Sequence, residues 1–94
     1  EAFAAVVLCC LKAMEDPAFC KDRLGRSQPL GIVDWDRLNV YGGSIALGHP
    51  FAATGARMVT TMARGLHDSP GRKHALLGIC AAGGLGAAAV LERV

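Results

Sequence analysis

Apolar residues recur at helical spacing through the first fifteen residues of the chain. They stand three or four positions apart, and the charged residues of this stretch lie near its ends: Phe3, Val7, Cys10, Leu11 and Met14. This pattern predicts a largely buried helix over residues 1–15. The helix is expected to end at Asp16-Pro17, because the residue before a proline disfavours the helical conformation.

Residues 18–41 show no sustained period. Charged residues alternate irregularly with Gly25, Pro29 and Gly31. This stretch is predicted to be a long surface connection, in which residues 30–35 form a short extended piece.

A second helical pattern follows a glycine-rich segment. Four glycines fall between residues 42 and 55, a density that allows close approach of a ligand or positive φ angles. Helical spacing then continues to residue 67, and Thr54 is predicted to be the N-cap of this helix. The glycine-rich segment is therefore expected to lead into the N-terminus of a helix over residues 54–67, where unpaired N–H groups favour anions.

The C-terminal part of the chain contains two apolar runs separated by the glycine-rich sequence AAGGLG. We expect residues 74–80 and 85–92 to form two strands joined by a tight connection.

The composition indicates that the chain does not form a self-sufficient domain. The 94 residues are 52% hydrophobic and 19% charged, and a chain of this length buries only about 60% of its unfolded surface. The sequence therefore predicts a chain that needs more partner surface than it carries. The presence of Glu1 in place of an initiator methionine is consistent with a truncated chain.

Several classes of protein are excluded at this stage. No stretch has the roughly 20 apolar residues of a membrane span, and no basic segment precedes an apolar run as in a secretory signal. The net charge of +2 forms no basic stripe, which argues against nucleic acid as a partner.

The four cysteines have neither the C-x-x-C spacing nor the neighbouring histidines of a zinc site, so no metal is expected. Cys9, Cys10 and Cys20 are predicted to be buried, reduced thiols that pack as small hydrophobic groups. A reducing compartment follows, and both the bacterial cytoplasm and the mitochondrial matrix fit it.

The glycine clusters leave one alternative open. Neither cluster continues into the Gly-Lys-Ser/Thr of a phosphate loop. Gly84 and Gly86 fit a relaxed dinucleotide-binding pattern, but the residues that follow have no room for its helix and ribose-binding acid. An NAD-binding module is the weaker interpretation.

His49 and Cys80 are the candidates for chemistry. His49 lies between Gly48 and Pro50 in the glycine-rich segment, and Cys80 ends an apolar strand just before a glycine-rich turn. A lone loop histidine is usually solvated and a lone buried cysteine is usually inert, but both residues stand at the ends of elements, where catalytic groups are common. A histidine and a thiol can carry nucleophilic or acid–base chemistry. His67 and His74 are predicted to lie at the surface.

Three blocks of the sequence resemble a known family. GGSIALGHPFAATGAR at 42–57 and CAAGGLG at 80–86 are similar to the two C-terminal signature blocks of thiolases, and EAFA at 1–4 is similar to a third. Together with LGRS at 24–27, the sequences of these blocks are most similar to those of the 3-ketoacyl-CoA thiolase subunit of fatty-acid oxidation complexes.

The resemblance implies roles for individual residues. His49 would activate a nucleophilic cysteine and donate a hydrogen bond to the thioester oxyanion, and Cys80 would act as acid and base. The backbone N–H of Ala82 would contribute to an oxyanion hole. Phe3 would line the acyl or pantetheine pocket, although a core aromatic is an equally good interpretation, and Gly48 and Gly83 would also belong to the substrate-binding surface.

The resemblance also implies an α/β fold, the C-terminal fragment of a layered αβαβα thiolase fold with a mixed five-stranded sheet. Residues 1–94 would be a partial C-terminal domain. The substrates would be acyl-CoA and coenzyme A, with no further cofactor, and the partners a second copy of the chain and the hydratase/dehydrogenase subunit of a fatty-acid oxidation complex.

The nucleophilic cysteine of the family has no counterpart in these blocks. Cys9 and Cys10 follow EAFA within a helical pattern and do not match it. The expectation is therefore a segment that is active only together with a nucleophile-bearing half. The alternative is a catalytically inactive thiolase-like fragment or interaction module.

Overall fold

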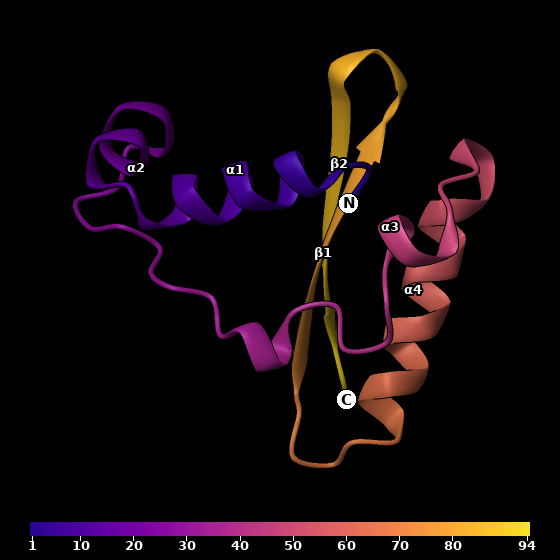
Figure 1. The fold of residues 1–94 in the computed structure, drawn as a ribbon. Coiled ribbons are helices and arrows are strands. Elements are labelled where there is room, and N and C mark those ends of the chain that lie inside the picture. The colour runs from indigo at the N-terminus through magenta and orange to yellow at the C-terminus, as the bar shows by residue number, and fades with distance from the viewer. The chain divides into compact units, whose positions relative to one another are not determined.

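The computed structural model describes residues 1–94 as two compact units (Figure 1). We call residues Phe3–Gly42 the N-terminal unit, and Glu1–Ala2 together with Gly43–Val94 the C-terminal unit.

The N-terminal unit contains two consecutive helices, α1 (Ala4–Glu15) and α2 (Pro17–Leu24). Asp16 separates them, as expected, but it also starts the second helix: its Oδ1 accepts hydrogen bonds from the N–H groups of Ala18 (2.8 Å) and Phe19 (3.2 Å). Pro17 occupies the first turn, where its missing N–H is not needed. The prediction that a surface connection begins at residue 18 was therefore wrong, because a side-chain cap and a proline start a helix that has little apolar periodicity.

Burial in the N-terminal unit is confined to Cys20, whose Sγ donates to the carbonyl oxygens of Ala13 (3.5 Å) and Met14 (3.6 Å). The prediction that the first helix is largely buried was wrong, since α1 has no buried residue. Cys9 and Cys10 are exposed free thiols, so only one of the three cysteines expected to be buried is buried. A helix whose apolar residues point around much of its circumference cannot be covered by one short neighbouring helix.

Of the expected extended piece over residues 30–35, residues 30–34 belong to no helix or strand, and Asp34 has an extended backbone conformation. These residues pair with no strand, and Trp35–Arg37 form a single 3₁₀ turn. The Oδ1 of Asp34 accepts a hydrogen bond from the N–H of Asp36 (3.0 Å), which caps this turn. Local side-chain capping of this kind competes with strand formation.

The C-terminal unit is built from α3 (Ser44–Leu47), α4 (Phe51–His67), β1 (His74–Ala81) and β2 (Leu85–Glu92). The two strands form an antiparallel hairpin in which Cys80 lies opposite Gly86. Both predicted strands are confirmed. The loop Ala82–Gly84 that joins them has Gly83 and Gly84 at φ angles of 75° and 74°, a region in which side chains other than glycine are strained.

The α/β class is thus confirmed, with helices beside a two-stranded sheet. The mixed five-stranded sheet stays a prediction.

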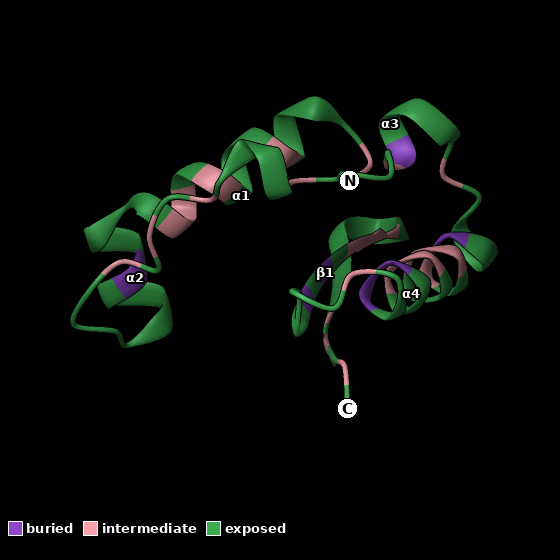
Figure 2. Cartoon of the chain, turned by 90° about the horizontal axis from the view of Figure 1, so that it is seen from below, coloured by how far each residue is buried: buried purple, intermediate pink, exposed green.

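Helix α4 packs against one face of the hairpin (Figure 1). Alternate residues of β1 point to opposite faces, and Ala75 and Leu77 are buried while Leu76 is exposed. Leu66 of α4 is buried as well, so the small core of this unit lies between α4 and β1, where Figure 2 shows buried segments on both elements.

Leu77 offers a test of this core. Its side chain is 2% exposed, so Leu77→Ala is expected to lower the free energy of unfolding by about 2 to 5 kcal/mol through lost burial and a cavity. Leu76→Ala, on the next residue, is the matched control because Leu76 is 66% exposed. Urea unfolding followed by circular dichroism measures both changes, and equal losses would contradict the assignment of faces.

The open face of the hairpin confirms the excess of apolar surface expected from the composition. Leu76 lies opposite Val90, and both side chains are 66% exposed. None of the helices is long and apolar enough to cross a membrane.

Candidate functional site

His49 lies in a three-residue connection, Gly48 to Pro50, between α3 and α4. Gly48 has φ 96° and ψ 164°, a conformation that only glycine adopts without strain. Pro50 is the N-cap of α4, so the helix begins at Phe51, three residues before the predicted start. The prediction that Thr54 is the N-cap was therefore wrong. Thr54 lies inside the first turn of the helix. The structural consequence is that the Thr54 side chain is held beside the histidine.

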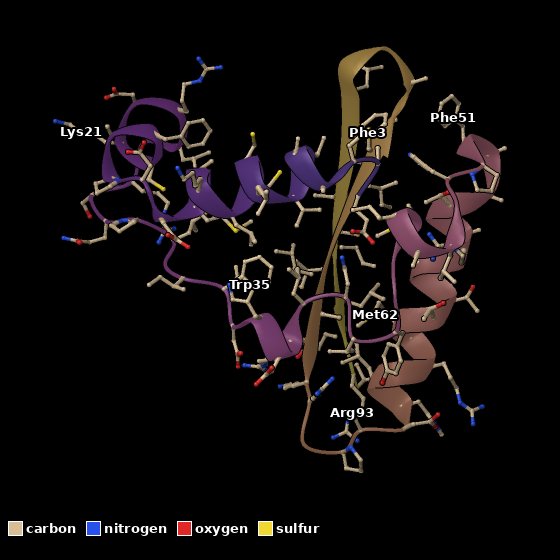
Figure 3. The ribbon with its side chains drawn as sticks, viewed as in Figure 1. Phe3, Lys21, Trp35, Phe51, Met62 and Arg93 are labelled. Atoms are coloured by element: carbon tan, nitrogen blue, oxygen red, sulfur yellow. The ribbon has the colours of Figure 1, made fainter.

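A chain of two hydrogen bonds holds the imidazole. Its Nδ1 lies 2.8 Å from Thr54 Oγ1, and the same oxygen donates to the carbonyl oxygen of Pro50 at 3.0 Å. Thr54 is only 2% exposed. Phe51 packs edge-on against the imidazole, with ring centroids 5.3 Å apart and an interplanar angle of 77°. Figure 3 shows Phe51 at the start of α4.

The other ring nitrogen of His49 is left free. Nε2 is buried and has no hydrogen-bond partner. A buried polar atom without a partner costs about 1–3 kcal/mol, and a catalytic role is one of the physical reasons for which such an atom is retained. The imidazole is thus held through Nδ1, while Nε2 is unpaired.

The segments on either side of His49 are joined by a further hydrogen bond. Arg57 Nη2 in α4 donates to Ser44 Oγ in α3 at 2.9 Å, and Ser44 is buried. This bond ties the start of α3 to the second turn of α4 and so restricts the connection that carries His49. Arg57 Nε is buried without a partner.

Ser44, Thr54 and Arg57 were not recognised from the sequence as neighbours of the site. Pro50 directly after His49 is a helix-start signal that would have placed Thr54 one turn inside the helix. No comparable signal relates Ser44 to Arg57, because they belong to different helices.

Cys80 is the second-to-last residue of β1, near the glycine-containing loop, as expected, and Ala81 separates it from that loop. It is partly buried, and its Sγ lies 3.7 Å from the carbonyl oxygen of Ala81. Alternation along the strand places Cys80 on the face of Leu76 and not on the face that α4 covers. Cys80 and His49 form no hydrogen bond with each other.

Comparison with known proteins relates this arrangement to a family. The family model described as "Thiolase, C-terminal domain" matches residues 1–93. The chain belongs to the thiolase family. The match includes the segment around His49 and the hairpin that carries Cys80.

Curated thiolases are similar to the chain over almost all of its length. The 3-ketoacyl-CoA thiolase of Aeromonas salmonicida is 56% identical over 98% of this chain. The proteins of the same name from Photorhabdus laumondii and Photobacterium profundum are 55% and 54% identical, again over 98% of the chain. In each case the match covers 21% of the relative, so this thiolase segment spans about a fifth of the length of these proteins.

The remaining predicted site residues lie in different parts of the segment. Gly48 directly precedes His49. Ala82 and Gly83 form the loop after Cys80, and both are exposed. Phe3 is the N-cap residue of α1 in the N-terminal unit, and its side chain is 71% exposed, so the interpretation as a core aromatic finds no support within this chain.

The other titratable groups lie away from these residues. His67 and His74 are exposed, as predicted, and His67 belongs to the C-terminal end of α4. Hydrogen bonds from His67 and from Arg64 hold the pKa of the Asp68 carboxyl below its usual value. No three side chains of His, Cys, Asp or Glu are grouped so that they could hold a metal ion.

The dinucleotide-binding alternative is contradicted by the hairpin. That pattern requires a glycine turn that opens a helix. The residues from Leu85 to Glu92 instead form a strand.

Proposed function

We propose that this chain is the catalytic C-terminal segment of a 3-ketoacyl-CoA thiolase. The reaction is the cleavage of a 3-ketoacyl-CoA by coenzyme A, which yields acetyl-CoA and an acyl-CoA two carbons shorter. Membership of the thiolase family and the names of the similar proteins support the reaction class. The observation that carries the proposal is the buried, unpartnered Nε2 of His49 on an imidazole held from its other side.

His49 would serve the first half of the reaction through this Nε2 atom. It takes the proton of a nucleophilic cysteine, whose sulfur then attacks the keto carbon of the substrate. The bond between C2 and C3 breaks, and the electron pair moves to the departing acetyl-CoA enolate. The protonated Nε2 then donates a hydrogen bond to the enolate oxygen, a contribution of about 10²- to 10³-fold in rate for one such donor.

Cys80 would act as the acid in the first half of the reaction and as the base in the second half. Its thiol gives a proton to C2 of the enolate and releases acetyl-CoA. The resulting thiolate takes the proton of the incoming coenzyme A, whose sulfur attacks the acyl-enzyme. The nucleophilic cysteine leaves as a thiolate and takes back the proton from Nε2 of His49, which restores the starting state. The backbone N–H of Ala82, in the exposed loop after Cys80, would donate a hydrogen bond to the oxyanion of this second step.

Coenzyme A is a substrate in this scheme, and the scheme needs no further cofactor or metal. Phe3, Gly48 and Gly83 are the other residues proposed to line the substrate path. The open apolar face around Leu76 and Val90 supports assembly with further protein surface. We propose that this includes a second copy and the hydratase/dehydrogenase subunit of a fatty-acid oxidation complex.

The nucleophilic cysteine is proposed to lie in a preceding part of a longer polypeptide. The segment spans only about a fifth of the length of these relatives, which supports this proposal. The test compares thiolysis of acetoacetyl-CoA by the 94-residue chain alone with thiolysis by the polypeptide that also contains the nucleophile-bearing half.

We expect no turnover by the segment alone and acetyl-CoA formation by the longer polypeptide. Turnover by the segment alone would contradict the requirement for a separate nucleophile. Absence of thiolysis in both would favour the alternative, an inactive thiolase-like fragment or interaction module.

A further inference from the structure

We propose that Thr54 is a positioning residue that fixes the tautomer of His49, with the proton on Nδ1 and the lone pair on Nε2. The use of that lone pair rests on the proposed function. The tautomer itself rests on the hydrogen bonds around Thr54 and on the absence of an acceptor for Nε2.

The argument starts from the single proton of the Thr54 hydroxyl. A hydroxyl donates once and accepts through its lone pairs. The Thr54 Oγ1 atom is 3.0 Å from the carbonyl oxygen of Pro50, which can only accept, so the hydroxyl proton belongs to this bond. The remaining contact of Oγ1, with His49 Nδ1 at 2.8 Å, must then be a hydrogen bond that Nδ1–H donates.

The opposite tautomer is less favourable for two reasons. If Nδ1 carried no proton, the hydroxyl would turn toward it, and the oxygens of Thr54 and Pro50 would face each other at 3.0 Å without a proton between them. Nε2 would carry a buried N–H with no acceptor, and orphaned buried N–H groups are rarer than unpaired acceptors. The proposed tautomer therefore makes one more hydrogen bond and leaves a lone pair, not a donor, without a partner.

The position of Thr54 makes this arrangement rigid. Its side chain is 2% exposed, so water does not compete for the hydroxyl. Its place in the first turn of α4 brings Oγ1 to the carbonyl four residues earlier, a bond that threonine forms readily in helices.

This tautomer suits a histidine that first accepts and then donates a proton. When Nε2 takes a proton, Nδ1 keeps its own, and Thr54 continues to accept from it. No hydroxyl or ring has to turn during the transfer, so the site is already organised for the imidazolium. A histidine held in the other tautomer would have to lose its Nε2 proton before it could act as a base.

The first test is ¹⁵N NMR of the full-length polypeptide with labelled histidines, with the His49 signals assigned by their loss in His49→Gln. In the wild type and in Thr54→Ser we expect a protonated Nδ1 and an unprotonated Nε2 in the neutral ring. In Thr54→Val, which keeps the shape but removes the hydroxyl, the Nε2-protonated form should become populated. An Nε2-protonated neutral ring in the wild type, or an unchanged Thr54→Val spectrum, would overturn the proposal.

The second test is thiolysis kinetics of the same variants. We expect kcat of Thr54→Val to fall about 10- to 100-fold with KM for coenzyme A unchanged, and Thr54→Ser to stay within about twofold of the wild type. The loss is smaller than the roughly 10⁴-fold that follows replacement of a triad carboxylate, because a neutral hydroxyl stabilises an imidazolium less. A Thr54→Val enzyme with normal kcat would also overturn the proposal.

The two measurements separate this inference from the proposed function. Failure of the wild type to cleave a 3-ketoacyl-CoA would contradict the function, while the NMR result would still decide the tautomer. If Thr54→Val does not fold, the wild-type and Thr54→Ser spectra alone confirm or overturn the assignment.

Discussion

Cys80→Ala in the complete enzyme is expected to lower thiolysis of acetoacetyl-CoA by about 10²- to 10⁴-fold, the usual contribution of a positioned acid or base. The variant has no group that protonates the enolate and none that deprotonates the incoming coenzyme A. Formation of the acyl-enzyme from an acyl-CoA should be partly retained, because a thiolate is a good leaving group even without a proton donor. Steady-state rates measure the first effect, and single-turnover labelling of the nucleophile measures the second.

The chain offers a matched control for this experiment. Cys10→Ala removes a thiol that is exposed on α1 and takes no part in the proposed chemistry. Its rate is expected to stay within about twofold of the wild type. Near-normal turnover of acetoacetyl-CoA by Cys80→Ala would refute the role assigned to Cys80.

His49→Gln is expected to lower kcat/KM by at least about 10²- to 10³-fold, because it removes both the proton acceptor and the oxyanion donor. In contrast to Cys80→Ala, it should also slow acyl-enzyme formation, since the nucleophile is no longer deprotonated. Single-turnover labelling therefore distinguishes the two variants. His67→Gln, at an exposed position near the end of α4, is the control and should leave the rate nearly unchanged.

Equal labelling rates in His49→Gln and the wild type would contradict the role of His49 as the activator of the nucleophile. A thiolysis defect without a labelling defect would restrict the role of His49 to hydrogen bonding with the oxyanion.

The elements with strong local signals were predicted from the sequence. The two strands were placed within one residue of their ends, because two apolar runs on either side of glycines leave a hairpin as the simplest solution. Helix α2 was missed because its signals are a capping aspartate and a proline at the start, and not an apolar stripe. Strand and helix periodicities do not detect an element that is defined by its ends.

The candidate site was predicted only in part. The identities of His49 and Cys80 came from their positions within or just before glycine-rich segments and from the resemblance to thiolases. The burial of α1 was overestimated, because an apolar pattern shows which residues tend to be covered but not whether a covering element is present.

The sequence by itself determined the α/β class, the family and the two side chains proposed for chemistry. These features depend on which residues are present and on their order along the chain. Only the tertiary structure decided which nitrogen of His49 is held and which is free, because that depends on where Pro50 starts α4 and so on where the Thr54 hydroxyl lies. The tertiary structure likewise decided that Ser44 and Arg57 join α3 to α4, since a hydrogen bond between two helices requires both to be folded.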